Sequence, residues 1–214
     1  KSNNLNHYYV TNSSSELNLI KSPKSYVHPE IKNEKGHNWE LIKKDTIDKI
    51  KISLFDGLES QLRIKKSILF FINRYINNPF YNYFVYLIYS NNKENAALIS
   101  LRFDSKKDIK VLRIVDYYGS PEILRDSGKG FKEIMNLNNV EYTDFWSFGI
   151  PKEIMSSIGF QLVEEGKGII VPNYFEPFIQ KNTQILFAYK DSTQKNKDLL
   201  IFKGDGDQDR PNHL

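Results

Sequence analysis

The sequence contains no cysteine among its 214 residues. This absence excludes disulfide bonds, thiolate nucleophiles and zinc sites built on cysteine. It is typical of proteins that fold in a reducing compartment, so we expect a cytoplasmic protein.

Long apolar runs and long basic runs are also missing. No apolar run approaches the ~20 residues that a helix needs to cross a bilayer, so we expect no membrane span. The net charge is only +4, and lysine alternates with acidic residues along most of the chain. Proteins that bind nucleic acid concentrate their basic residues on one face. We therefore do not expect a nucleic-acid partner.

The apolar content is large enough for a folded core. Apolar residues make up 40% of the chain, with 13 Tyr and 14 Phe, and the length suits a single domain. Residues 1–38 are polar and predict an N-terminal arm or interdomain segment with little regular structure. Residues 39–214 predict the domain itself. His28 and His37 have no spacing that indicates a metal site, and we predict no metal ion.

Three strand-like runs in the middle of the chain predict an antiparallel meander. They span residues 83–89, 96–103 and 109–115, are rich in β-branched and aromatic residues, and are separated by polar turns. The pattern then changes to helical periodicity. A meander followed by helices restricts the architecture to a few α/β or α+β folds.

Further elements are predicted from apolar spacing and from residues that begin or end helices. Ser120 and Pro121 are a favourable N-cap and first helical residue for a helix that ends near residue 137. Pro151 opens a short helix, and Gly159 suits the position just after its end. Helices are also expected at residues 39–54 and 62–76, and strands at residues 140–148, 160–163, 169–171, 183–189 and 199–203.

This order of elements resembles the core of the GNAT superfamily of acyl-CoA N-acyltransferases. Ser157, Ile158, Gly159 and Phe160 are similar to the helix, Gly-Phe and strand ending common in that superfamily. Several other runs resemble a GNAT-like branch associated with surface-glycan biosynthesis. These runs are residues 73–81, 113–119, 141–145, 171–178 and the most specific one, residues 204–212, which reads GDGDQDRPN.

The resemblance, which covers residues 62–212, implies a fold and an activity. The fold is a GNAT-like α/β (α+β) domain with a mixed, mostly antiparallel central sheet flanked by helices. The activity is an acetyltransferase-like transfer from acetyl-CoA or another acyl-CoA, used as a co-substrate, to an amino group. The implied acceptor is a small molecule, an amino sugar or a nucleotide-sugar for surface polysaccharides. In longer relatives this block is the C-terminal half.

The resemblance also directs attention to an anion site for the CoA pyrophosphate. Such folds bind it with backbone N–H groups at a helix N-terminus. Arg125, Gly128 and Gly130 match the superfamily's Gln/Arg-x-x-Gly-x-Gly/Ala pattern. If the helix begins at Ser120, however, these glycines lie in its middle. The alternative anion site is then the helix start after Tyr117, Tyr118 and Gly119.

Acyl transfer to an amine needs a base, and often an acid for the leaving thiolate. Asp116 follows the strand at residues 109–115, where a partly desolvated carboxylate has a raised pKa that suits a base. It could equally cap a turn. Tyr142 and Asp144 on the next strand are further catalytic candidates, with hydrogen bonding at the edge of the core as the structural alternative.

Asp207, Asp209 and Arg210 form a charged cluster near the C-terminus. They predict a substrate- or sugar-binding group, or an ion pair that pins the C-terminus onto the sheet. Alternating carboxylates can also hold a divalent cation, but the glycine of a calcium loop is misplaced here and no Glu follows.

Two other functions remain open at this point. A non-catalytic GNAT-like domain that binds a ligand or a partner would explain glycines in the middle of a helix. A Fem-type aminoacyl transferase shares the fold and predicts a twin domain upstream and a basic groove. Fold alone does not decide between these functions.

Overall fold

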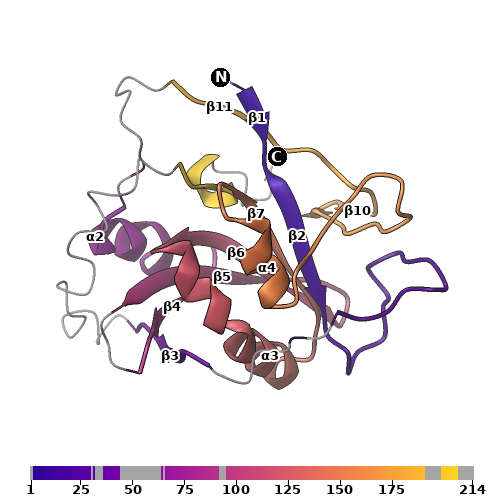
Figure 1. Ribbon diagram of the computed structural model, residues 1–214, viewed down its shortest axis with the longest axis horizontal. Coiled ribbons are helices and arrows are strands. Elements are labelled where there is room, and N and C mark those ends of the chain that lie inside the picture. The colour runs from indigo at the N-terminus through magenta and orange to yellow at the C-terminus, as the bar shows by residue number, and fades with distance from the viewer. Residues whose placement is uncertain are drawn as a thin grey trace.

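Figure 1 shows a computed structural model of the chain, in which residues 2–29, 31, 36–43, 64, 66–91, 95–190 and 199–206 are described. The strands are β1 (Ser2–Asn4), β2 (Asn6–Thr11), β3 (Asn38–Leu41), β4 (Tyr83–Tyr89), β5 (Ala96–Lys106), β6 (Ile109–Tyr118), β7 (Val140–Phe148), β8 (Gln161–Leu162), β9 (Tyr174–Phe175), β10 (Phe178–Ile179), β11 (Leu186–Ala188) and β12 (Ile201–Phe202). The helical elements are α2 (Ile68–Phe71), η3 (Ile72–Ile76), η4 (Pro121–Asp126), α3 (Gly128–Leu137), α4 (Lys152–Ser157) and η5 (Lys203–Gly206).

The centre of the molecule is a mixed, mostly antiparallel sheet, as predicted. Its strand order is β3-β4-β5-β6-β7-β2-β8, and β12 pairs with the last two residues of β7. Within the described part of the chain, β6 and β7 are the parallel neighbours in this sheet. A parallel pair requires a crossover, which η4 and α3 supply.

The register determines which side chains share a face. Tyr83, Arg102, Arg113 and Asp144 lie in one row across β4, β5, β6 and β7, so they point to the same side of the sheet. A register shift between Ser100 and Leu101 inserts one extra residue into β6. Because of this bulge, Asp116 lies on the same face as Arg113 although the two are three positions apart.

Helices cover both faces. On the face that carries Asp116, Phe71 of α2 packs near Tyr118, with ring centroids 6.4 Å apart. Strand alternation places Trp39 on the other face, where Phe131 of α3 lies 4.9 Å from it. Phe160, which follows α4, lies 5.5 Å from Phe131. No helix among the described residues is long and apolar enough to cross a membrane.

The N-terminal residues correct one expectation. Instead of little regular structure, they contain β2, which pairs along its whole length with β7 and on its other side with β8 (Figure 1). Tyr8, Tyr9 and Val10 are buried. The short apolar run at these three residues is therefore a strand inside the sheet. The polar residues on both sides of it led to the prediction of little regular structure.

Three other predicted elements differ from the structure. Residues 39–41 belong to β3 and not to a helix, while residues 44–54 of that prediction lie outside the described residues. Residues 169–171 form only a bridge from Ile170 to Lys21. The helix expected from Pro121 to residue 137 is divided into η4 and α3 at Ser127, whose N–H bonds to the Leu124 carbonyl.

Candidate functional site

Asp116 lies near the C-terminal end of β6 in a fully paired environment. Its carboxylate forms an ion pair with Lys66 and accepts hydrogen bonds from the Tyr75 hydroxyl at 2.7 Å and the Tyr117 N–H at 2.8 Å. Lys66 also pairs with Asp205 of η5 at 2.9 Å. Asp116 is completely buried and Lys66 is 3% exposed. One ammonium group thus joins two carboxylates that are far apart in the sequence.

Burial raises the pKa of Asp116, and the neighbouring Asp205 adds to the rise, while Lys66 and Tyr75 oppose it. Burial also raises the pKa of Tyr75, and the carboxylate beside it acts in the same direction. Tyr75 therefore stays a hydroxyl that donates to Asp116. A carboxylate with a raised pKa has the proton affinity that a general base needs.

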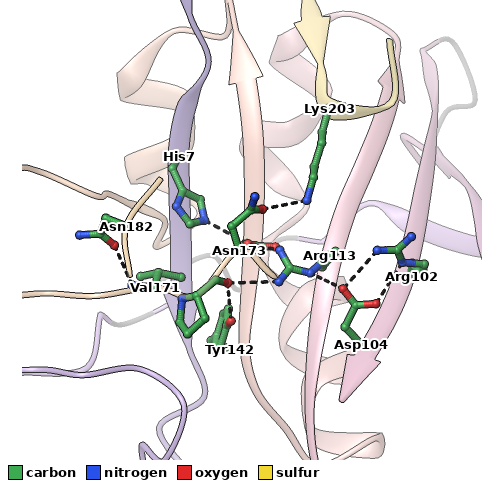
Figure 2. A network of polar contacts seen from close by, with 11 residues as sticks. His7, Arg102, Asp104, Arg113, Tyr142, Val171, Asn173, Asn182 and Lys203 are labelled. Carbon is green, nitrogen blue, oxygen red and sulfur yellow. Dashed lines mark hydrogen bonds and ion pairs between the residues drawn. The ribbon is translucent and has the colours of Figure 1, made fainter. Parts of the chain in front are cut away.

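Arg113 is the centre of a second buried group on the same face (Figure 2). Its guanidinium donates to Asp144 at 2.7 Å, to Asp104 at 2.5 Å and to the Pro172 carbonyl at 3.1 Å. Arg102 adds a further ion pair to Asp104 at 3.1 Å. A planar guanidinium suits this arrangement because its donors point in fixed, divergent directions.

His7 reaches this group from β2. Its Nε2 lies 3.0 Å from Asp144 Oδ2, and its ring stacks on Trp146 at 4.0 Å. Burial lowers the pKa of His7 although Asp144 opposes the effect. Burial alone would raise the pKa of Asp144, but Arg113 and His7 outweigh it and the pKa falls. The ionised Asp144 therefore accepts a hydrogen bond from the Nε2–H of a neutral His7.

Lys203 of η5 completes the buried group. Its ammonium is 2.8 Å from the Asn173 side-chain oxygen (Figure 2), and the residue is 4% exposed. Burial, followed by the charge of Arg113, lowers the pKa of Lys203 to about 7. Lys203 therefore changes its charge near neutral pH.

The three predicted catalytic residues fall into these two groups. Asp116 belongs to the group of Lys66 and Tyr75, whereas Tyr142 and Asp144 belong to that of Arg113. Tyr142 donates to the Pro172 carbonyl at 3.0 Å, the same oxygen that Arg113 contacts, and burial raises the pKa of Tyr142. The structure brings Tyr142 and Asp144 together through Arg113.

Tyr117, Tyr118 and Gly119, predicted to lie near CoA, end β6 and lead into η4. Both tyrosines are buried, and the Tyr117 hydroxyl donates to the Ser120 carbonyl at 2.7 Å. A Cβ on Gly119 would lie 2.4 Å from the Ala97 Cβ, so β5 leaves room only for glycine. Ser120 caps η4 by accepting from the Glu122 N–H.

The predicted phosphate loop coincides with the start of α3. Gly128 is the first residue of this helix, and the first hydrogen bond runs from the Phe131 N–H to the Ser127 carbonyl at 3.3 Å. The N–H groups of residues 128–130 precede that bond, as in any helix start. Gly130 also has a packing role, because a Cβ there would lie 2.3 Å from the Trp39 indole. Arg125 forms an exposed ion pair with Glu122 at 2.9 Å.

The predicted substrate-binding residues Asp207, Asp209 and Arg210 lie outside the described residues. Asp205, just before them, accepts from the Phe202 N–H at 2.8 Å and pairs with Lys66. Among the described residues, no group of three His, Asp or Glu side chains is arranged to hold a metal ion.

The C-terminal segment occupies the space where β6 and β7 stop pairing. The β6–β7 register ends at Ile114 and Phe145, and β12 pairs with β7 from Ser147 to Phe148. Phe202 stacks on Phe145 at 5.5 Å with 5° between the rings. Residues 199–206 therefore fill the gap and close over Asp116.

No family model matches the chain, and no curated protein does. The chain is similar to solved structures at low identity. Saccharomyces cerevisiae N-myristoyltransferase with bound myristoyl-CoA is 10% identical over 75% of this chain and 48% of that chain, with a TM-score of 0.45. A second structure of that enzyme with bound myristoyl-CoA is 12% identical over 78% of this chain and 46% of that one, with a TM-score of 0.45.

A GCN5-related N-acetyltransferase from Anabaena variabilis ATCC 29413 is 12% identical over 75% of this chain and 38% of that chain, with a TM-score of 0.46. The present chain thus spans less than half the length of each of these structures.

Sequence reasoning missed several ionisable residues of the site, among them His7, Lys66, Arg113 and Lys203. Two of these residues could have been recognised from their positions in the sequence. Arg113 interrupts the apolar strand at residues 109–115, and Lys203 ends the apolar run before the GDGDQDRPN block. A charge in such a position calls for a buried partner. His7 and Lys66 carried no comparable signal, because both stand in polar stretches.

Proposed function

We propose that the chain is an acyl-CoA-dependent N-acyltransferase that acylates an amino group. One observation carries this proposal: the strands and helices from β4 to β8 follow the order that the sequence resemblance implies, with β6 and β7 as a parallel pair joined by η4 and α3. Ligands in sheets with parallel strands bind beyond the carboxyl ends of those strands. Asp116 and Gly119 lie at that end of β6.

The anion-binding part of this proposal rests on the first turn of α3. Free N–H groups and the helix dipole favour a phosphate at this position. Lys129 lies in the same turn, and its side chain is 58% exposed, so it can add a positive charge. We assign this turn to the CoA pyrophosphate, with Arg125 one turn earlier as a second cation.

The reaction requires the protein to position the two substrates and to accept one proton. A neutral amine attacks the thioester carbonyl, the new C–N bond forms and the C–S bond breaks; the proton that the nitrogen loses as the amide forms goes to the leaving sulfur, which departs as the thiol. Before the attack, a base removes one proton from the ammonium form of the amine. We assign this role to Asp116, which Lys66 and Tyr75 hold in place. Tyr142 and Asp144 position Arg113 on the same face.

The acceptor belongs to the proposal as well. The resemblance to the surface-glycan branch supports an amino sugar or a nucleotide-sugar. Asp207, Asp209 and Arg210 directly follow η5, whose Asp205 pairs with Lys66 beside Asp116. We propose that these three residues bind the acceptor.

Calorimetric titration with acetyl-CoA, and with CoA for comparison, tests the proposal. We expect both to bind, and Lys129→Glu to weaken binding at least tenfold. Lys132→Glu is the matched control, since it makes the same charge change one turn further from the helix start, on an exposed side chain. If the two variants weakened binding equally, the assignment of the pyrophosphate to the first turn of α3 would be wrong. If neither acetyl-CoA nor CoA bound, an acyl-CoA-dependent activity would be refuted.

One observation favours a second candidate, a non-catalytic domain of the same fold. Residues 199–206 fill the space between β6 and β7 and bury Asp116, and Trp39 covers Gly130 at the start of α3. A domain that binds a ligand or partner elsewhere needs no access to Asp116. The titration separates the two candidates, because this one predicts no heat from either CoA ligand.

A further inference from the structure

A groove runs along the outer edge of β8, at the end of the sheet farthest from β3. It has a volume of about 660 Å³, within the range of ~300–1,000 Å³ typical of ligand sites. Gln161, Leu162 and Glu164 form one side of it, and residues 23–29 contribute to the other. The two sides belong to segments far apart in the sequence.

The backbone of Leu162 faces this groove, and none of the described residues forms a hydrogen bond with it. In the register of β8 with β2, Leu162 is opposite Tyr8 and Gln161 is opposite Tyr9. The Val163 N–H donates to the His7 carbonyl at 2.8 Å. Antiparallel strands alternate bonded and non-bonded pairs, so the N–H and C=O of Leu162 point away from β2, and the described part of the chain offers them no partner. This is an open strand edge.

The groove offers apolar contacts beside this edge. Phe160 and Ile169 are buried side chains on its wall, and Val27 is 78% exposed at its rim. The Tyr9 hydroxyl donates to Gln161 Oε1 at 3.0 Å, which fixes the Gln161 side chain and leaves its amide N–H groups available. Apolar pockets beside an unpaired strand edge are the features that bind an extended peptide.

The charges at the rim of the groove favour a negatively charged partner. Lys152 and Lys167 both approach Glu164, at 3.9 and 2.6 Å. Two ammonium groups share one carboxylate, and their side chains are 61% and 66% exposed. The groove therefore has an excess positive charge, in a chain whose net charge is +4. A segment with acidic side chains complements it.

We propose that this groove docks an extended, acidic segment of a partner protein, which adds to the sheet as a strand beside β8. The segment exchanges main-chain hydrogen bonds with Leu162. Its apolar side chains pack on Val27 and Ile169, and its acidic side chains face Lys152 and Lys167. This docking surface is independent of the acyl-transfer site, which lies on the other side of β7 and β2.

The test is selection from a random peptide library displayed on phage, with the full chain as target. We expect enriched peptides in which apolar and acidic residues alternate. Binding of their synthetic versions should fall at least tenfold in Leu162→Pro and change little in Leu162→Val. Proline removes the outward N–H, while the N–H groups of Gln161 and Val163, which face β2, remain; valine also changes the side chain but keeps the N–H.

A second variant protects the test against a folding defect in Leu162→Pro. Lys152→Glu combined with Lys167→Glu changes exposed side chains only, and it should shift the selected peptides from acidic to basic. The proposal is overturned if no peptide is enriched, or if the enriched peptides bind both variants as well as the original chain. It is also overturned if sedimentation shows a dimer that Leu162→Pro abolishes, since a second copy would then be the occupant.

Discussion

At the scale of single residues, Arg113 organises the largest buried set of charges. Its side chain, with the residue 1% exposed, reaches Asp104, Asp144 and the Pro172 carbonyl at once. Desolvation by burial disfavours the charge on Arg113, but Asp144 and Asp104 outweigh it and raise its pKa. Each charge of the set is tolerated inside the protein because the others are present.

Replacing Arg113 with methionine should therefore be costly. Arg113→Met leaves the buried Asp144 and the partly buried Asp104 without their main counter-charge, and removing one partner of a buried pair costs about 3–5 kcal/mol. Urea unfolding measures the loss. Arg125→Met is the matched control, because Arg125 pairs with Glu122 at the surface, and it should leave stability unchanged. Similar unfolding midpoints for the two variants would contradict the described network.

Lys203 predicts a pH dependence whose sign follows from its lowered pKa. The group has a pKa of 10.5 when exposed and about 7 in the folded chain. Between these values the unfolded chain binds a proton that the folded chain does not, so folding stability decreases as the pH falls from 10.5 to 7. Below 7 both states are protonated and the penalty is complete.

Lys203→Met removes this proton linkage. The stability of the variant relative to the original chain should increase as the pH falls from 10 to 7, by up to about 1.4 kcal/mol per pH unit. Chemical denaturation at several pH values measures the difference. Lys132→Met, which alters an exposed lysine of α3, should give a difference that does not vary with pH. A flat difference for Lys203→Met would refute the lowered pKa.

At the scale of elements, sequence patterns located most strands but not every neighbour. The strand predicted at residues 140–148 is β7, and the one predicted at residues 83–89 is β4. Both are rich in β-branched and aromatic residues, which indicate a strand from the local sequence alone. β2 has only a short apolar run, and β7 and β8 give it its place. Such distant pairing cannot be read from a local pattern.

The division between η4 and α3 shows a second limit of prediction from apolar periodicity. Ser120 and Pro121 correctly mark a helical start, but the continuous periodicity after them gave no sign of the break at Ser127. Its side chain donates back to the Ile123 carbonyl at 2.8 Å, and the helix resumes with Gly128. Trp39 of a distant strand then packs on Gly130, a contact that helical periodicity does not contain.

Gly130 makes this packing testable. Alanine normally stabilises a helix relative to glycine by about 1 kcal/mol, but a Cβ at residue 130 would lie 2.3 Å from the Trp39 ring. Gly130→Ala should instead destabilise the chain by about 1–3 kcal/mol, the typical cost of overpacking. Thermal or urea unfolding reports the sign. In a chain that already carries Trp39→Ala, adding Gly130→Ala should no longer destabilise the fold. If Gly130→Ala alone stabilised the chain, the contact with Trp39 would be disproved.

At the scale of the whole molecule, the sequence predicted the sheet class, the meander and the crossover that follows it. The site was predictable only in part. Asp116, Tyr142 and Asp144 stood out because they interrupt or border apolar strands. Their partners His7 and Lys66 come from β2 and from the segment before α2, Lys203 comes from η5, and only the fold brings these residues to one face.

The position of the C-terminal segment, residues 199–206, was also not predictable from the local sequence. Nothing in the local pattern of residues 199–206 indicates that they fill the space between β6 and β7, two strands that come much earlier in the chain. Their role follows from the pairing of β12 with β7 and from the pair between Asp205 and Lys66. Residues 199–206 are thereby part of the candidate site.

The central claim is that an acyl-CoA binds where β6 leads into α3. Amide hydrogen exchange of the full chain, with and without acetyl-CoA at millimolar concentration, tests it most directly. Residues 116–131 should exchange more slowly with the ligand present, because a bound pyrophosphate occupies the first N–H groups of α3 and restrains the segment before it. Unchanged exchange across residues 116–131, with or without slowing elsewhere, would contradict the claim.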